Sequence, residues 1–425
     1  MVENSKPKIA ILTIKNSYNY GGVFSCLQQV YTFCQKYHFD PTIFCLSFDK
    51  KISTSLRRLK FSSSIKKSEY FGMNYTEIGA KWAFWEPGHY VFNLHHWQKA
   101  LEDYDYFFVV SGNSFAAYPL IQLKKKFGMW IASPYEDDRV QRVNGLSGFR
   151  KAIYNLAYSK IIRIEKDIIS KADFIWALSK YTANRFNQII GQKRENMVIC
   201  NYPMGIKLKS VDQKKNKNII AVGRFNDPRK NLGMLIRVFD QLYKHNQSLK
   251  LYIVGSKPTN ETLRKFPSVK SFNNIIFTGQ VSSKELEKLY KQSDLMLITS
   301  HQEGLGIIGL EAMSYGIPVV STKCGGTTDF IIDDFNGYLV DVSDDNDMVL
   351  KSLKILHDHN LAKKMSANAL NYLETNFSVK KMESIFMYGL TKIYPELINL
   401  FEHKDINLNN ILNSNIDYKK EHAQV

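Results

Sequence analysis

The feature that most constrains the fold is a repeated alternation of short apolar runs with longer amphipathic segments. A first series of apolar runs includes "KIAILTI", "PTIFCLS", "DYFFVVSGN", "FGMWIASP" and "ADFIWALSK". After the polar stretch "SVDQKKNKN", a second series contains "IIAVGR", "LKLYIVGS", "NIIFTGQ", "DLMLITS", "IPVVST" and "GYLVD". Short strands separated by helical segments are typical of parallel sheets with crossover helices. The pattern therefore predicts two successive α/β domains.

Length and composition support this division. A chain of 425 residues exceeds what one hydrophobic core normally serves, and 44% hydrophobic residues can fill two cores. We predict an N-terminal domain over residues 1–205 and a second domain over 206–378. A helix over 379–400 and a polar tail over 401–425 follow. The five cysteines form no C-x-x-C pair, which favours reduced thiols over a disulfide or zinc framework.

Localisation and charge give weaker indications. The apolar run near the N-terminus is too short for a signal peptide, and no stretch reaches about 18 apolar residues, so we expect a cytoplasmic protein, at most peripheral on the inner face of a membrane. Residues 1–205 hold 28 Lys and Arg against 16 Asp and Glu, a net charge of +12 out of the total of +17. A basic half favours an anionic partner, or is simply a solvated Lys-rich surface.

Gly304, Gly306 and Gly309 have the G-x-G-x-x-G spacing of a dinucleotide-binding loop. That loop normally follows the first strand of its domain, and an acidic residue at the end of the second strand binds the ribose. Here the preceding strand is the fourth of its series, and "IPVVSTKCGG" supplies no acid. The glycines still allow a phosphate to approach the N-terminus of the next helix, so they predict a phosphate group without naming the molecule that carries it.

Two carboxylates and two cations indicate what kind of molecule carries the phosphate. Glu303 precedes the glycines and Glu311 follows within the next short helix, where both can accept hydrogen bonds from sugar hydroxyls. Arg224 and Lys230, in "VGRFNDPRKNLGML", flank the loop after another strand of the same series. Carboxyl ends of parallel strands meet at one edge of a sheet, so these groups predict a site for a nucleotide diphosphate sugar.

With these residues the sequence resembles the retaining glycosyltransferases of family 4, which have the GT-B fold of two Rossmann-like domains facing a central cleft. The resemblance rests on "EGLGIIGLEAMSYGIPVVSTKCGG", with two glutamates separated by seven residues, and on "VGRFNDPRKN". It implies that Arg224 and Lys230 contact the donor diphosphate and that Glu311 binds the ribose. It implies that Glu303 and the Gly304–Leu305–Gly306–Ile307 segment face the donor sugar. By the same resemblance Gly279 to Val281 read the base, and the 379–400 helix crosses back to the first domain.

The resemblance also implies a reaction. A hexosyl unit would move from a UDP- or GDP-sugar to a glycan, lipid-linked or protein acceptor, in cell-envelope or polysaccharide biosynthesis. Because fixed cations and a helix dipole can stabilise the departing phosphate, we expect neither a metal nor a cofactor. Two other functions remain open. One is a nucleotide-linked oxidoreductase, which is disfavoured because no acidic residue stands where it would bind the ribose. The other is a nucleic-acid-binding protein, which only the positive net charge supports.

The first domain offers fewer candidates. Gly21 and Gly22 open a helix after the first strand, either as a tight turn or as a loop near the acceptor or the departing phosphate. Where family members often carry a histidine, this chain has Pro134, Tyr135 and Glu136, and Glu136 is either part of a capping cluster or an acceptor contact. The Asp103-Tyr104-Asp105 segment precedes a strand and is interpreted as a surface turn, not a metal site.

A basic segment over residues 50–67 suggests membrane docking. Its cations alternate with apolar side chains, and tryptophans follow at 82, 85 and 97. This composition suits an anionic lipid surface or, equally, a flexible basic loop.

Overall fold

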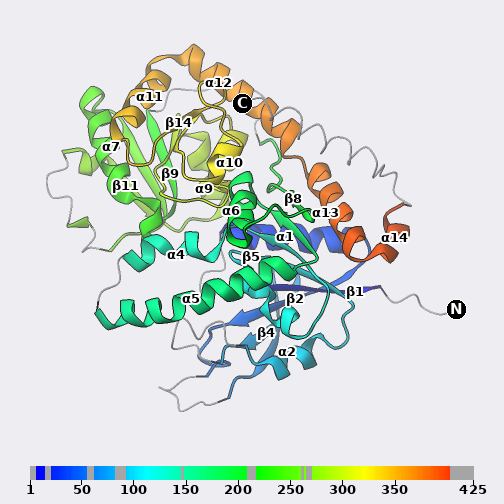
Figure 1. Ribbon diagram of the computed structural model, residues 1–425. Coiled ribbons are helices and arrows are strands. Elements are labelled where there is room, and N and C mark those ends of the chain that lie inside the picture. The colour runs from blue at the N-terminus through cyan, green and yellow to red at the C-terminus, as the bar shows by residue number, and fades with distance from the viewer. Residues whose placement is uncertain are drawn as a thin grey trace. The chain divides into compact units, whose positions relative to one another are not determined.

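The computed structural model describes residues 6–14, 21–54, 62–81, 92–144, 148–207, 217–259, 263–264 and 270–402. The chain divides into two compact units (Figure 1). The first contains the described residues within 1–138, 146–201 and from 380 onward, and the second contains 139–145 and 202–379. Most of the basic 50–67 segment, Trp82, Trp85 and the tail beyond 402 lie outside the described residues.

The first unit is built on a sheet with the strand order β3-β4-β2-β1-β5-β6-β7-β8 within the described residues. Its strands are β1 (Lys8–Ile14), β2 (Asp40–Ser47), β3 (Ile65–Tyr70), β4 (Met73–Gly79), β5 (Tyr106–Ser111), β6 (Gly128–Ile131), β7 (Phe174–Ala177) and β8 (Met197–Ile199). All neighbours pair in parallel except β3 and β4, which form an antiparallel hairpin at one edge. The apolar pattern did not predict this hairpin, because β3 is mostly polar and exposed on both faces.

Helices cover both faces of this sheet. They are α1 (Gly22–Lys36), α2 (Leu94–Leu101), α3 (Tyr118–Gln122), α5 (Gly148–Lys171), α6 (Lys180–Ile190), α13 (Val379–Ile393) and α14 (Ile398–Glu402). A further helix, α4 (Tyr135–Asn144), begins in this unit, and its residues from Arg139 onward belong to the second unit. Phe386 of α13 packs edge-on against aromatic rings of α1, β5, β6 and β7. Gly389 of α13 lies directly against the indole of Trp176, where a Cβ would come within 2.3 Å of the ring. The segment from residue 380 therefore forms part of the core of the first unit.

The second unit has a parallel sheet with the order β11-β10-β9-β12-β13-β14 within the described residues. Its strands are β9 (Asn218–Arg224), β10 (Lys250–Ser256), β11 (Ile275–Gly279), β12 (Leu295–Ile298), β13 (Val319–Thr322) and β14 (Tyr338–Val340). Its helices are α7 (Leu232–His245), α9 (Ser283–Lys291), α10 (Ile307–Ser314), α11 (Asp345–His357) and α12 (His359–Asn376). Strand order reverses between β9 and β12, and ligands bind at such switch points in open α/β sheets.

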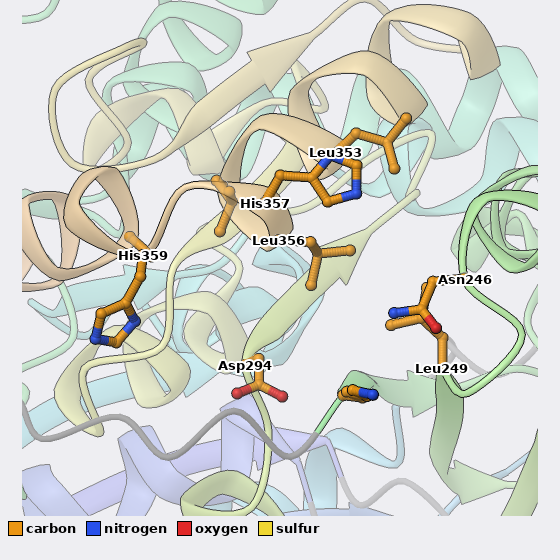
Figure 2. Close-up of a pocket in the computed structure, with 10 residues that line it drawn as sticks. Asn246, Leu249, Asp294, Leu353, Leu356, His357 and His359 are labelled. Atoms are coloured by element: carbon orange, nitrogen blue, oxygen red, sulfur yellow. The ribbon is translucent and has the colours of Figure 1, made fainter.

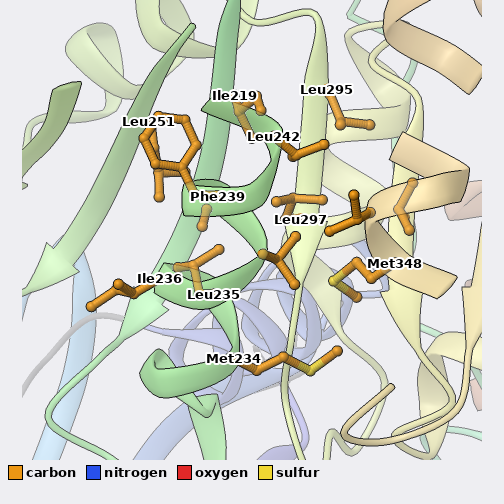
Figure 3. Close-up of a cluster of buried hydrophobic side chains, with 14 of the residues drawn as sticks. Ile219, Met234, Leu235, Ile236, Phe239, Leu242, Leu251, Leu295, Leu297 and Met348 are labelled. Carbon is orange, nitrogen blue, oxygen red and sulfur yellow. The ribbon is translucent and has the colours of Figure 1, made fainter. Parts of the chain in front are cut away.

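The core of the second unit lies between the sheet and the α7–α11 pair. Buried side chains of α7 such as Phe239 and Leu242 meet Leu251 and Leu297 from the strands and Met348 from α11 (Figure 3). The α7 connection moves along the sheet in one direction, while α9 and α10 lie on connections that move in the other. Because parallel crossovers are right-handed, α9 and α10 lie on the opposite face. This doubly wound arrangement puts every βα loop of the unit at one edge.

Candidate functional site

The predicted donor residues lie at the carboxyl-end edge of the second sheet. Arg224 is the last residue of β9 and Gly279 is the last residue of β11. Glu303 lies in the loop between β12 and α10, Ile307 is the first residue of α10, and Val281 lies between β11 and α9. Gly304, Leu305 and Gly306 form the link between Glu303 and the helix. Since β9 and β12 are neighbours, the loop that carries Lys230 meets the loop that carries Glu303.

Lys230 and Glu303 form a direct ion pair. The Nζ–Oε1 distance is 2.5 Å, and the side chains are only 14% and 13% exposed. Ser300 also donates a hydrogen bond to Glu303 Oε1, at 2.6 Å. Burial alone would raise the pKa of the Glu303 carboxyl, but Lys230, Ser300 and Arg229 outweigh it and hold the pKa below its usual value. The carboxylate is therefore ionised at neutral pH.

A second ion pair, between Arg229 and Asp227, is buried next to these residues. The Arg229 guanidinium contacts the Asp227 carboxylate with an Nη2–Oδ2 distance of 2.8 Å, and its Nη1 donates to Gln302 Oε1 at 3.3 Å. The Arg229 carbonyl accepts a hydrogen bond from the His301 amide, at 2.7 Å. Arg229 thus joins the loop after β9 to the loop after β12. This role of Arg229 could not be predicted from the sequence, because it depends on which strands are neighbours.

Arg224 lies in a more open environment than Lys230. Its side chain is 43% exposed, and its guanidinium lies 3.7 Å from the Asp227 carboxylate, which itself is 6% exposed. Lys230 ends the short 3-10 turn Pro228–Lys230 that precedes α7. The two cations therefore come from one loop, one projecting toward solvent and one held against Glu303.

The glycine-containing loop is held by the loop after β13. The Glu303 amide donates to the Cys324 carbonyl at 2.7 Å, and the Gly326 amide donates to the Glu303 carbonyl at 3.0 Å. Gly306, at the start of α10, has a φ of 84°, a left-handed conformation that favours glycine. The first amides of α10 are thereby fixed beside Glu303, as anion binding at a helix N-terminus requires.

Glu311 lies inside α10 and is partly buried. Its Oε2 accepts a hydrogen bond from the Tyr290 hydroxyl, at 3.0 Å. Burial raises the pKa of the Glu311 carboxyl, whereas the Tyr290 hydroxyl and the Lys207 charge lower it, and the net shift is upward. The two glutamates of the predicted motif therefore have opposite electrostatic environments.

The first-unit candidates lie at the carboxyl-end edge of their own sheet. Gly21 is exposed with a φ of 134°, and α1 begins at Gly22. Glu136 is in the first turn of α4, where it accepts a hydrogen bond from Tyr158 and forms an ion pair with Arg185 at 3.3 Å. The structure therefore gives Glu136 a role in holding α4 and leaves its acceptor role as a proposal.

A buried carboxyl beneath Glu136 was not identified from the sequence. Glu165 of α5 is fully buried, and its Oε1 accepts hydrogen bonds from Ser114 Oγ and from the Tyr135 amide, both at 2.9 Å. Burial, together with the nearby Asp137 and Glu136 charges, raises the pKa of the Glu165 carboxyl to about 7, although the two hydrogen bonds lower it. In the sequence Glu165 stands close to several lysines and arginines, a setting more typical of a solvated helix face.

The cavity in Figure 2 belongs to the opposite edge of the second sheet. Lys217, Leu249 and Asp294, which line it, immediately precede β9, β10 and β12, and His357 and His359 close it. It is therefore separate from the predicted donor residues.

Among the described residues, no group of three or more His, Cys, Asp or Glu side chains is arranged to hold a metal ion. Nor does that part of the chain contain a helix long and apolar enough to cross a bilayer.

Comparison with protein families shows which known proteins the second unit is similar to. Residues 206–372 match the family described as Glycosyl transferases group 1. This match lies within the second unit and covers less than half of the chain. An uncharacterized glycosyltransferase of Methanocaldococcus jannaschii is 24% identical over 229 residues, which are 54% of this chain and 61% of the relative. A sulfoquinovosyl transferase of Arabidopsis thaliana is 31% identical over 199 residues, 46% of this chain and 36% of the relative. The matched region thus spans less than two thirds of these relatives' own length.

Solved structures extend the likeness to both units. Sucrose-phosphate synthase from Thermosynechococcus elongatus superposes with a TM-score of 0.70 at 16% identity, covering 93% of this chain and all of that one. The Anabaena protein HepE, in complex with UDP and glucose, superposes with a TM-score of 0.68 at 16% identity, covering 91% and 99% of the two chains. The chain therefore shares the fold of these GT-B structures, with two α/β units each built on a largely parallel sheet, as the sequence predicted.

Proposed function

We propose that this protein is a retaining glycosyltransferase of family 4 that transfers a hexosyl unit from a UDP- or GDP-sugar to a glycan, lipid-linked or protein acceptor. The observation that carries the proposal is the meeting of the Arg224–Lys230 loop with the Glu303 loop beside the N-terminus of α10. Solved neighbours contain UDP or UDP-glucose, which supports a nucleotide-sugar donor. A role in cell-envelope or polysaccharide biosynthesis is part of the same proposal.

The proposed chemistry follows from the movement of charge. Breaking the bond between the sugar and the diphosphate leaves negative charge on the phosphate and positive charge on the anomeric carbon. Arg224, Lys230 and the amides at the start of α10 would stabilise the phosphate, so the step needs no metal. Glu303 would face the sugar. The acceptor would attack from the face that the phosphate leaves, with a phosphate oxygen taking its proton, which retains the anomeric configuration.

We expect nucleoside diphosphates and their sugars to stabilise the folded protein. A ligand at 100 times its dissociation constant raises the free energy of unfolding by about 2.7 kcal/mol. Thermal unfolding should be measured with UDP, GDP, UDP-glucose, GDP-mannose, NADH and duplex DNA. A shift with a nucleoside diphosphate or its sugar is the expected result. A shift with NADH alone, or with DNA alone, would replace the proposal by the oxidoreductase or the nucleic-acid-binding alternative.

Docking on an anionic membrane is a separate proposal about the basic 50–67 segment, which lies mostly outside the described residues. Each cation near an anionic surface contributes about 1 kcal/mol. We expect the protein to sediment with phosphatidylserine-containing liposomes at low salt and to be released at high salt. Equal recovery in the supernatant with and without liposomes would contradict docking and favour a soluble acceptor.

A further inference from the structure

A hydrogen bond joins Tyr290 of α9 to Glu311 of α10. The Tyr290 side chain is 2% exposed, and its hydroxyl donates to Glu311 Oε2 at 3.0 Å. The two residues lie on helices that follow different strands, β11 and β12. The bond therefore holds one carboxylate oxygen of Glu311 in place, and the residue that donates it lies outside the glutamate motif.

The Tyr290 ring is held in place independently of Glu311. It stacks on the Tyr315 ring with the centroids 5.2 Å apart and the planes 19° from parallel. The helix that carries it begins with a capping box, in which Ser282 and Glu285 exchange hydrogen bonds between side chain and backbone. A buried, stacked ring leaves its hydroxyl little freedom, so the phenol sets the orientation of the carboxylate.

The hydroxyl has a further effect on the charge of Glu311. Burial raises the pKa of this carboxyl, and the Tyr290 hydroxyl and Lys207 counteract the increase. An ionised carboxylate only accepts hydrogen bonds, whereas a protonated one would offer a donor in place of an acceptor. Without Tyr290, Glu311 would therefore remain protonated to a higher pH.

We propose that Tyr290 is a positioning residue for donor binding: it engages one oxygen of Glu311 and leaves the other directed at the ribose hydroxyls of the nucleotide sugar. The inference rests on the proposed function, since Glu311 as the ribose contact is part of it. Tyr290 itself does not touch the substrate. It determines how strongly the site distinguishes a ribose from a sugar that lacks these hydroxyls.

The test is Tyr290→Phe, which keeps the stacked ring and removes only the donor. Tyr315→Phe is the matched control, because it removes a hydroxyl from the other ring of the same stack. Binding of UDP, GDP and their 2′,3′-dideoxy counterparts should be measured by calorimetry. For the diphosphate that binds, we expect Tyr290→Phe to weaken the ribonucleotide about 10-fold, as loss of a charge-assisted hydrogen bond does, with little change for the dideoxy form. The ratio of the two affinities should stay near that of the wild type in Tyr315→Phe.

Kinetics give a second, independent readout. In Tyr290→Phe the KM for the donor should rise, increasingly so as the pH falls, while kcat changes little, because the ribose contact is made equally before and during reaction. Adding Tyr290→Phe to Glu311→Gln should have no further effect on the dideoxy discrimination. An unchanged affinity ratio in Tyr290→Phe would overturn the inference. If the wild-type protein bound no nucleotide or nucleotide sugar, the proposed function itself would fail.

Discussion

Replacing Lys230 with alanine should lower sugar transfer by roughly 100- to 1000-fold, the usual cost of removing one preorganised electrostatic donor. The charge is needed more in the transition state than in the bound donor, because the diphosphate gains negative charge as the bond breaks. The loss should therefore appear in kcat more than in the affinity for the donor. Steady-state kinetics with the nucleotide sugar identified by thermal unfolding measures both quantities.

The same substitution should also destabilise the protein, and here the structure changes the sequence-based expectation. From the sequence alone we expect Lys230→Ala to remain folded, because Lys230 stands at the start of a helix and not in a core. In the structure, Lys230 and Glu303 are both largely buried and paired at 2.5 Å. Removing one partner of such a pair leaves a buried charge uncompensated, which costs about 3 kcal/mol. We expect Lys230→Ala to lower the free energy of unfolding by that order.

Two companion variants separate the effects of Lys230 on folding and on catalysis. Lys230→Ala combined with Glu303→Gln should regain much of the stability, since the unpaired charge is gone, but not the activity. Arg224→Ala should lose activity with little change in stability, because Arg224 is 43% exposed. Urea unfolding beside the kinetic measurements distinguishes these outcomes. Near-normal turnover in both Arg224→Ala and Lys230→Ala would mean that the donor phosphate lies elsewhere.

The strands and helices of the second unit were predicted well from the sequence, because the spacing of apolar residues and the positions of turn residues are local properties. Each apolar run from "IIAVGR" to "GYLVD" is a strand, and α10 follows Gly306 as expected. Those local signals also placed Arg224 at the end of a strand, Lys230 just before a helix and Glu303 in the loop before the glycines. Lys230 can pair with Glu303 because β9 lies next to β12 in the sheet. A single sequence carries almost no information on strand order.

The contributions of Arg229, Tyr290 and Glu165 could not be predicted for the same reason. Each acts through a partner distant in the sequence: Arg229 through Gln302, Tyr290 through Glu311, and Glu165 through Ser114 and the amide of Tyr135. The β3–β4 hairpin was not predicted because its first strand lacks an alternation of apolar and polar residues. What the sequence lacked was therefore mostly information about contacts between elements, and these contacts hold the candidate site in shape.

Gly326→Ala should impair the site without removing any functional group. A Cβ at this position would lie 2.2 Å from the Gly304 carbonyl oxygen and 2.3 Å from Leu305 Cα. Both contacts are with backbone atoms, which cannot rotate away as a side chain can. The loop that carries Glu303 would have to move, and the hydrogen bond from the Gly326 amide to the Glu303 carbonyl would be strained. Overpacking of this kind typically lowers the free energy of unfolding by about 2 kcal/mol.

The displacement should affect activity more than stability. A shift of about 1 Å at a reacting centre can cost roughly 100-fold in rate, so we expect a loss of that order in kcat with the protein still folded. Gly205→Ala is the matched control: it is a glycine of the same unit whose φ is not positive, and an added Cβ there would meet no atom within 4 Å. Circular dichroism and steady-state kinetics on both variants test the prediction. If Gly326→Ala transferred sugar as fast as Gly205→Ala, the close contact between the loops after β12 and β13 would have no part in shaping the donor site.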